Sequence, residues 1–285
     1  MSRPLLPARS LALLLALLVL SACSRMELVY RNLDYLIPWK LDDYVSLDAE
    51  QSDWLDARLA AQLRWHCSRE LPRYLDWLDR QRPLLADRPS TARLEVALSE
   101  ARTLLQPSFA HLAPDAARLL AGLSTTQIAE LDENLAERRA EFAERYLGGS
   151  LAERLQRRIA VAQPRLEEWL GPLHPQQRAY LRLWAALQEA NVRPWLDYRA
   201  RWQAGLLAQL RQTPRETLAA RLEPQLADPE RHWDEDYRQA VQRSQQSLAE
   251  LLAELWASAT PAQHEHLQER LDSLREELAG LVCRG

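Results

Sequence analysis

Apolar residues recur at the three- and four-residue spacing of an α-helix along most of this chain. The clearest case is the C-terminal seam Leu267, Leu271, Leu274, Leu278 and Leu281, which is typical of a helix that buries one face. Similar runs begin near residues 48, 124 and 174, and residues 90–106, 108–121, 150–170 and 228–258 are predicted to be further helices. No useful stretch alternates as a half-buried strand does. The pattern therefore predicts an all-α fold.

A short cassette opens four of the runs. It has an apolar residue, usually a helix-capping residue next, and Gln three positions later; the four copies are Leu47-Asp48-Ala49-Glu50-Gln51, Leu123-Ser124-Thr125-Thr126-Gln127, Leu173-His174-Pro175-Gln176-Gln177 and Ala259-Thr260-Pro261-Ala262-Gln263. This is a capping box, in which the cap oxygen accepts from a first-turn N–H and the Gln side chain accepts from the cap's own N–H. His174 is the poorest cap of the four. The cassettes predict four main helix starts.

Prolines and glycines divide the predicted helices. Pro72 should break the first run near Glu70, and Pro194 should kink the run from His174 to about Arg211 near Asn191, because a proline lacks the N–H that a helix interior needs. We therefore predict a multi-helix bundle of long amphipathic helices with proline kinks. It would form one helical domain over residues 47–285, with possible sub-bundles 47–147 and 150–285 on either side of a hinge at residues 148–150.

The N-terminus reads as a targeting segment. Arg3 and Arg9 precede the apolar run Leu11–Leu20, which is too short for a membrane span but suits a signal peptide. The sequence Leu20-Ser21-Ala22-Cys23 resembles the lipobox of bacterial lipoproteins. That resemblance implies a signal peptide over residues 1–22, a lipidated Cys23, and a tether over residues 23–46. Because Ser24 replaces the Asp that retains lipoproteins at the inner membrane, it favours the periplasmic face of the outer membrane over the inner membrane.

The charge and the cysteine content limit the kinds of partner that this chain can be expected to bind. The net charge is −4 and no long basic run occurs, which does not suit a nucleic-acid surface. Only 7 of 285 residues are Gly and helix-forming residues dominate, in keeping with an all-α chain. Cys67 and Cys283 could form a disulfide in the oxidising periplasm, or could remain two separate thiols. The membrane, through the lipid anchor, and an envelope protein are the expected partners.

Candidate chemistry is sparse. No nucleophile elbow, phosphate loop or zinc spacing occurs, so no metal or cofactor is expected. Asp42 and Asp43 form an acidic pair that could hold a ligand or cap the first helix, and His66 is expected to bond to a carboxylate such as Glu70. Asp42, Asp43, His66 and Glu70 are the candidate functional cluster. Six tryptophans lie in two predicted arms and could pack in the core or line an aromatic groove: Trp54, Trp65, Trp77, Trp184, Trp195 and Trp202.

Two family resemblances follow from these motifs. Tyr30-Arg31-Asn32-Leu33-Asp34, Leu41-Asp42-Asp43-Tyr44-Val45 and Trp65-His66…Glu70-Leu71-Pro72 resemble an uncharacterised proteobacterial lipoprotein family, a domain of unknown function. Asp48 stands where that family usually has Thr. The repeated cassette is similar, more weakly, to that of the Spy/CpxP periplasmic chaperones, which are cradle-shaped helical dimers.

The functional expectation is a choice between two classes. A lipid tether, repeated amphipathic helices, many tryptophans and the lack of a catalytic motif favour a non-enzymatic, protein-binding or chaperone-like envelope factor. The alternative is a cell-wall-acting enzyme, or an activator of one, in which the candidate cluster would do acid–base work. Convergence of the four side chains in one pocket would favour the enzyme.

Overall fold

The fold is all-α, as predicted. The computed structural model describes residues 24–86 and 88–283, and no strand occurs within these ranges. The predicted signal peptide and Cys23 lie outside the described residues. None of the described helices is long and apolar enough to cross a membrane.

The helices follow one another with short connections. In chain order they are α2 (Ser24–Arg31), α3 (Leu33–Asp42), α4 (Ala49–Trp65), the π-helical turn η1 (His66–Glu70), α5 (Leu71–Ala86), α6 (Thr91–Thr103), α7 (Gln106–Ala121), α8 (Thr125–Leu147), α9 (Leu151–Leu170), α10 (Pro175–Leu187), α11 (Glu189–Gln212), α12 (Arg215–Ala227), the 3₁₀ turn η2 (Pro229–His232), α13 (Glu235–Ala257) and α14 (Pro261–Leu281). Three differ from the prediction: α2 and α3 occupy the expected tether, and α12 was not predicted.

Both long helices are interrupted near the prolines. The first run changes to a π turn that ends at Glu70, two residues before Pro72. The second run breaks at Gln188, between α10 and α11, and α11 then continues through Pro194. The second interruption therefore lies a few residues before the expected position near Asn191.

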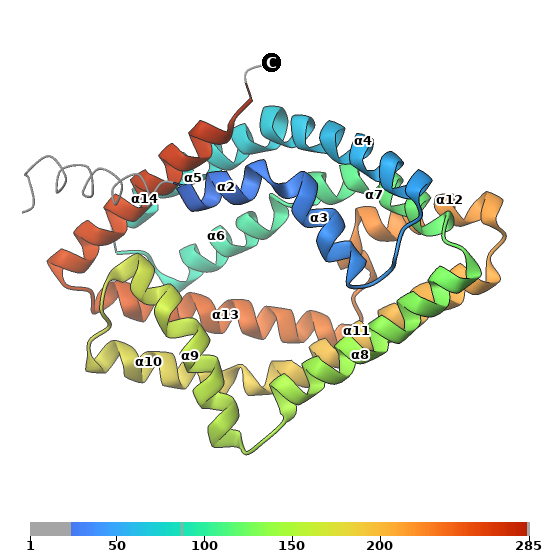
Figure 1. Cartoon of the computed structure of the whole chain (residues 1–285). Helices are drawn as coiled ribbons and strands as arrows, with labels where there is room; N and C mark the ends of the chain where they lie inside the picture. The colour runs from blue at the N-terminus through green and yellow to red at the C-terminus, as the bar shows by residue number, and fades with distance from the viewer. Residues whose placement is uncertain (1–23, 87, 284–285) are drawn as a thin grey trace, which may run out of the picture.

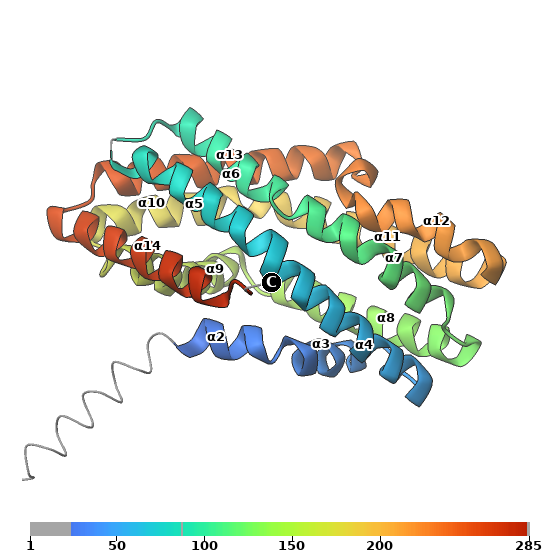
Figure 2. The ribbon, with the colours of Figure 1, turned by 90° about the horizontal axis from the view of Figure 1, so that it is seen from above.

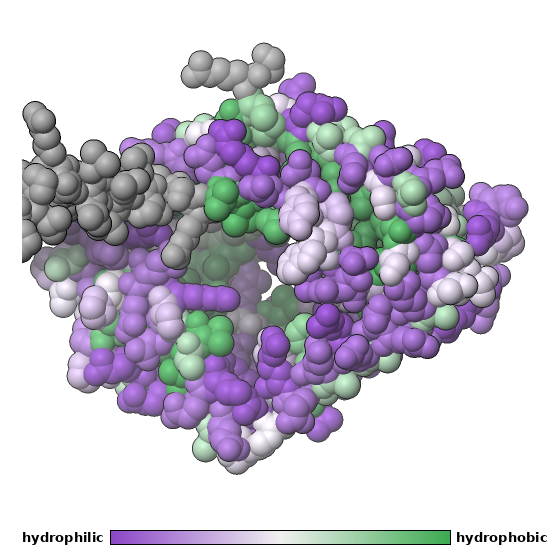
Figure 3. Space-filling view, in the orientation of Figure 1, coloured by the Kyte–Doolittle hydropathy of each residue, from purple (hydrophilic) through white to green (hydrophobic). Residues whose placement is uncertain are grey.

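The helices surround a central opening (Figure 1). Seen from above, α6 and α13 lie on one side of the molecule, and α2 and α3 lie on the opposite side (Figure 2). The space-filling view shows a hollow at the centre of one face, with apolar residues exposed in it (Figure 3). The bundle is therefore an open frame with an inner surface.

Helix contacts in the first half of the chain recur between the corresponding helices of the second half. In the first half α3 packs on α4 and α4 on α7; in the second half α9 packs on α10 and α10 on α13. The contacts of α11 with α13 and of α9 with α14 lie within the second half. Four further contacts join the halves in reciprocal pairs, α6 with α13 and α12 with α7, then α5 with α14 and α11 with α8. This is the pattern of two similar units related by a twofold axis. The two halves make many contacts with each other. Whether residues 47–147 and 150–285 form separate sub-bundles therefore stays a prediction.

The four cassettes form two pairs, and the glutamine side chains of each pair are hydrogen-bonded to each other. Gln51 Nε2 donates to Gln127 Oε1 at 3.2 Å, and Gln127 Nε2 donates back to Gln51 Oε1 at 2.6 Å. Gln177 and Gln263 make the same reciprocal pair, with both bonds at 3.0 Å. Each pair joins the first turn of two helices that are more than 70 residues apart in the chain, α4 with α8 and α10 with α14.

Every hydrogen-bonding position of these glutamine amides is used. Each Oε1 also accepts from the backbone N–H of its own cap residue, Asp48, Ser124, His174 or Thr260. Each Nε2 also donates to a backbone carbonyl, from Gly122, Ser46, Leu255 or Pro172. An amide offers two donors and two acceptor lone pairs, so nothing remains unpaired. A Glu could cap these helices, but it lacks the N–H donors that the pairs require.

Two apolar clusters flank the paired helix starts. The larger joins α7, α8, α11 and α12 around residues such as Ala117, Leu135 and Leu222. The second joins α9, α10, α13 and α14 around Leu181 and Leu255, which are 0% and 1% exposed. The larger cluster lies where helices of the two halves meet, whereas the second cluster lies within the second half, beside the Gln177–Gln263 pair.

A disulfide closes the C-terminal end. The Sγ atoms of Cys67 and Cys283 are bonded, with 5.2 Å between the Cα atoms, and the Cys283 N–H donates to the Cys67 carbonyl. Cys67 is 2% exposed and packs with Leu71 and Leu281. The bridge therefore joins the π turn of the first half to the end of the second.

The glutamine pairs give a first prediction. Gln177→Glu keeps the capping box but removes two donors from a buried pair, so it should lower the free energy of unfolding by about 2–4 kcal/mol at neutral pH. Burial raises the pKa of the introduced carboxyl, and its protonation restores a donor; the loss should therefore shrink as the pH falls through that pKa. Urea unfolding at several pH values measures this.

The matched control for that substitution is Glu153→Gln. Glu153 caps α9 with Ser150 in the same way but has no second box opposite it, so the change should cost less than about 1 kcal/mol. Equal losses in the two variants, or no pH dependence for Gln177→Glu, would contradict the pairing account.

The disulfide gives a second prediction. Cys283→Ser should lower the free energy of unfolding under oxidising conditions by about 2–5 kcal/mol, because the bridge closes a long loop. A reductant should lower the stability of the unsubstituted chain by a similar amount and leave the Cys283→Ser variant unchanged. Two cysteines that both react with a thiol reagent in the folded, oxidised protein would refute the bridge.

Candidate functional site

Asp43, just after α3, is held by two cations. Its Oδ2 lies 2.5 Å from Lys40 Nζ and 3.5 Å from the guanidinium of Arg138 on α8. The hydrogen bond from Lys40 and the positive charges of both neighbours lower the pKa of this carboxyl below its usual range. Asp43 is therefore a paired, ionised carboxylate that links α3 to α8.

His66 and Glu70 lie on the π turn but do not bond to each other. His66 Nδ1 lies 2.9 Å from Tyr30 Oη, and its ring meets the edge of Tyr74. Burial lowers the pKa of His66, although the charge of Glu70 opposes this. Glu70 is buried and pairs with Arg73 at 2.7 Å. The expected bond from His66 to Glu70 is wrong, because each side chain has another partner.

Asp42 points to a different place. It is exposed and lines a groove of about 600 Å³ between α3 and α4, which the other three candidates do not line. Tyr35, Trp39 and Leu55 provide apolar walls of this groove, and Asp34 and Asp56 add two more carboxylates. The four predicted residues thus do not form one constellation in the described structure.

The surface beside the α3–α4 groove is apolar and exposed. Leu28 is 62% exposed, Tyr35 68% and Trp39 60%. These side chains lie on α2 and α3, the helices that directly follow position 23 in sequence. Tyr35 and Trp39 are one helical turn apart on α3, so they form an exposed aromatic pair at the α3–α4 groove.

A second cavity, of about 580 Å³, lies where α9 meets α8, α10 and α13. Its wall has an apolar part, to which Val161, Leu166 and Leu251 belong. The wall also carries five arginines, one from α8 and four from α9: Arg145, Arg154, Arg157, Arg158 and Arg165. No carboxylate lines this cavity. We call it the arginine cavity.

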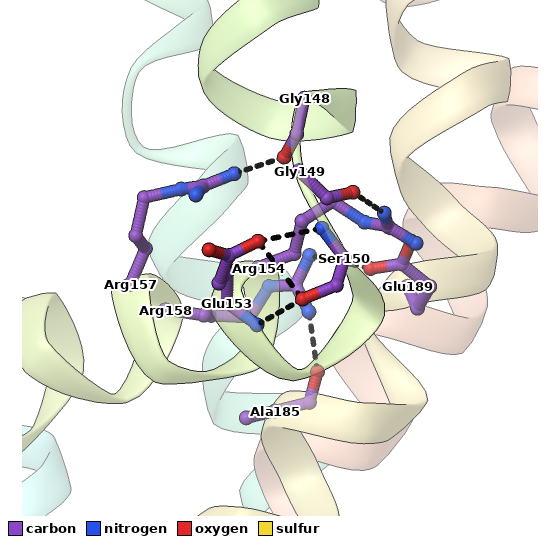
Figure 4. Close-up of polar contacts among 9 residues, drawn as sticks. All are labelled: Gly148, Gly149, Ser150, Glu153, Arg154, Arg157, Arg158, Ala185 and Glu189. Atoms are coloured by element: carbon purple, nitrogen blue, oxygen red, sulfur yellow. Dashed lines mark hydrogen bonds and ion pairs between the residues drawn. The ribbon is translucent and has the colours of Figure 1, made fainter.

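The glycine junction between α8 and α9 orients these arginines (Figure 4). Arg157 donates to the Gly148 carbonyl at 2.5 Å, and Arg154 donates to the Gly149 carbonyl at 2.8 Å. Gly149 has φ = +78°, which favours glycine, and a Cβ on Gly148 would meet the Glu144 carbonyl at 2.4 Å. The chain therefore needs glycine at both positions to turn from α8 into α9.

Glu189 of α11 fixes two arginines from the other side. Its carboxylate pairs with Arg154 at 2.7 Å and with Arg158 at 3.3 Å, while Arg158 also donates to the Ala185 carbonyl at 2.5 Å. Burial alone would raise the pKa of Glu189, but these hydrogen bonds lower it below its usual range. The ion pairs hold the guanidinium groups of α9 against α10 and α11.

An aromatic cavity of about 340 Å³ adjoins the arginine cavity. The two share Tyr146, Arg158 and Trp184, and the aromatic cavity adds Trp195 and Tyr237. The tryptophans thus divide between the two predicted roles. Trp184 and Trp195 line a cavity, whereas Trp202 packs on the large apolar cluster.

No group of three or more His, Cys, Asp and Glu residues within the described ranges is placed to hold a metal ion. Cys23, the predicted lipidation site, lies outside those ranges. The arginine cavity was not predicted from sequence, although Arg154, Arg157, Arg158 and Arg165 share one face of a helix at spacings of three, one and seven residues. That face was the available signal.

The comparisons give a family but no function. The chain matches DUF6279, a family of unknown function, over residues 43–238. No curated protein and no solved structure matches the chain. Since the matched segment covers more than half of its length, this chain belongs to the family of unknown function DUF6279.

Proposed function

We propose that this protein is a non-enzymatic, lipid-anchored envelope factor that binds other proteins in a chaperone-like way. The observation that carries the proposal is the apolar surface of α2 and α3 with its adjoining groove. Leu28, Tyr35 and Trp39 are more than half exposed there, which costs hydration free energy unless a partner covers them. Asp34, Asp42 and Asp56 give the α3–α4 groove a negative charge, so apolar segments next to basic residues suit it best.

The location is part of the same proposal. The lipobox-like sequence ends at Cys23, directly before α2, so lipidation there would tether the apolar surface close to a membrane. Two or three acyl chains anchor a protein stably, whereas one chain binds only marginally. The absence of Asp after Cys23 favours the periplasmic face of the outer membrane.

The enzyme alternative has less support. Asp43 pairs with Lys40, Glu70 pairs with Arg73, and His66 contacts Tyr30, so three of the four candidates have partners in separate places. General acid–base catalysis needs groups that reach a common substrate atom. This arrangement suits structural roles for these residues better than a shared catalytic role.

The likeness to the Spy/CpxP chaperones supports the proposal by analogy. Those proteins are cradle-shaped helical dimers with a similar cassette. Here two pairs of cassettes occur in one chain, and the frame that they join is also hollow and twofold in its contacts. The analogy concerns the physics of paired helix starts.

A third prediction tests the anchor. Mass spectrometry of the membrane fraction should find an N-terminal Cys23 that carries two or three acyl chains. Cys23→Ser should leave the chain unprocessed, because the thiol is the predicted attachment point. A mature, soluble Cys23→Ser protein would rule the anchor out.

A fourth prediction tests binding. The protein should suppress aggregation of a test protein diluted from guanidinium, and Trp39→Ser with Tyr35→Ser should lose most of this effect with the fold retained. An exposed residue elsewhere, in Leu183→Ser, provides the control. A photocrosslinker at position 39 should capture envelope proteins in living cells.

A loss of enzymatic activity in the candidate-cluster variants would contradict the binding proposal. If Asp43→Ala or His66→Ala abolishes a wall-cleaving activity without unfolding the chain, while position 39 captures no protein, the binding proposal is wrong.

A further inference from the structure

The arginine cavity has an excess of positive charge that the protein itself does not neutralise. Five guanidinium groups line it, and Glu189 is the carboxylate that pairs with two of them. Glu153 lies near Arg157 and offsets part of its charge, while its Oε2 accepts hydrogen bonds from the N–H and hydroxyl of Ser150. The net charge of the whole chain is −4, so the positive charge is concentrated locally at this wall.

The two arginines at the ends of this set have no carboxylate partner in the described structure. Arg145 lies with its guanidinium 5.8 Å from the centre of the Phe142 ring, which leaves its N–H donors available. Arg165 lies on α9, two turns beyond Arg158, and has no ion pair there. Guanidinium groups bind carboxylates and phosphates with two parallel hydrogen bonds, so both arginines suit an anionic group.

The cavity is also lined by apolar side chains. Val161 and Leu166 lie on α9 with the arginines, Leu248 and Leu251 lie on α13, and Trp184 connects the cavity to the aromatic cavity. The indole N–H of Trp184 is buried and has no acceptor within the described ranges. A volume of about 580 Å³ is in the range of small-molecule sites, which span roughly 300–1,000 Å³.

We propose that the arginine cavity binds an anionic amphiphile, with its acyl chain along the apolar wall and its carboxylate or phosphate group on the arginines. Apolar surface alone would accept any apolar chain, and arginines alone would accept any anion. Their combination in one cavity, which is open to solvent, selects a molecule that has both. This site is separate from the α2–α3 surface of the proposed function, and it can be present whether or not that surface binds proteins.

Photoreactive ligands test the proposal on the purified lipidated protein in nanodiscs of phosphatidylcholine. The probes are a diazirine-bearing hexadecanoate, the corresponding lysophosphatidate and the uncharged hexadecanol analogue, with crosslinked residues mapped by mass spectrometry. We expect at least one anionic probe to label residues 158–166 or 248–251, and the alcohol to label them much less. The two anionic arms distinguish a carboxylate from a phosphate head group.

Matched variants make the result specific. Arg145→Gln with Arg165→Gln should reduce labelling about tenfold, because each loses a charge-assisted hydrogen bond to the ligand. Arg182→Gln, an exposed arginine on α10, should leave labelling unchanged, as should Trp39→Ser in the α3–α4 groove. Val161→Asn changes a wall residue that is 57% exposed and should also reduce labelling while the fold is kept.

Two results would overturn the proposal. One is equal labelling by the anionic probes and the alcohol, which would mean that the arginines do not select the ligand. The other is labelling that does not map to the cavity, or that the arginine variants leave unchanged although circular dichroism shows them folded.

Discussion

The fold depends on the reciprocal hydrogen bonds between glutamine side chains at paired helix starts. Gln177 is fully buried, and a buried amide is tolerated only when all its donors and acceptors are used. Its pair with Gln263 meets that condition only if α10 and α14 start at the same place in space. The pair is therefore a geometric constraint as well as a contact, and the apolar clusters are built around helices that it positions. Gln51 and Gln127 impose the same constraint on α4 and α8.

This constraint explains why the bundle can be hollow. A compact bundle holds its helices together through one central core. Here one apolar cluster lies between the halves, another lies within the second half, and the centre of one face is hollow. Helices fixed at their starts, and by the Cys67–Cys283 bridge at one end, can leave inner and lateral surfaces uncovered. Two such surfaces result, with opposite character: the α3–α4 groove is lined by carboxylates, and the arginine cavity by guanidinium groups. We propose both as binding surfaces.

Local signals in the sequence predicted the fold better than the site. Helix starts were predictable because a capping box uses residues only three positions apart. The reciprocal pairing of the boxes was not, because it joins residues more than 70 positions apart, for which a single sequence offers no distance. The predicted kink near Asn191 was placed a few residues too late in the chain. The structure breaks the run at Gln188, and α11 then continues through Pro194. Asp43 and His66 were singled out by residue type. In the structure Asp43 forms an ion pair with Arg138 and His66 is hydrogen-bonded to Tyr30, and both partners come from distant segments. The arginine face of α9 was visible in sequence, yet part of the apolar lining comes from α10 and α13, which are distant in the chain.

A double-mutant cycle on Gln177 and Gln263 tests the central claim most directly. The free energy of unfolding is measured for Gln177→Ala, Gln263→Ala and the double variant. If the two amides form the buried pair, each single substitution leaves one donor and one acceptor position of the other amide unpaired. The double variant should therefore lose little more than either single one, with a coupling energy of about 1–3 kcal/mol. Strictly additive losses, with no coupling between the two positions, would contradict the account.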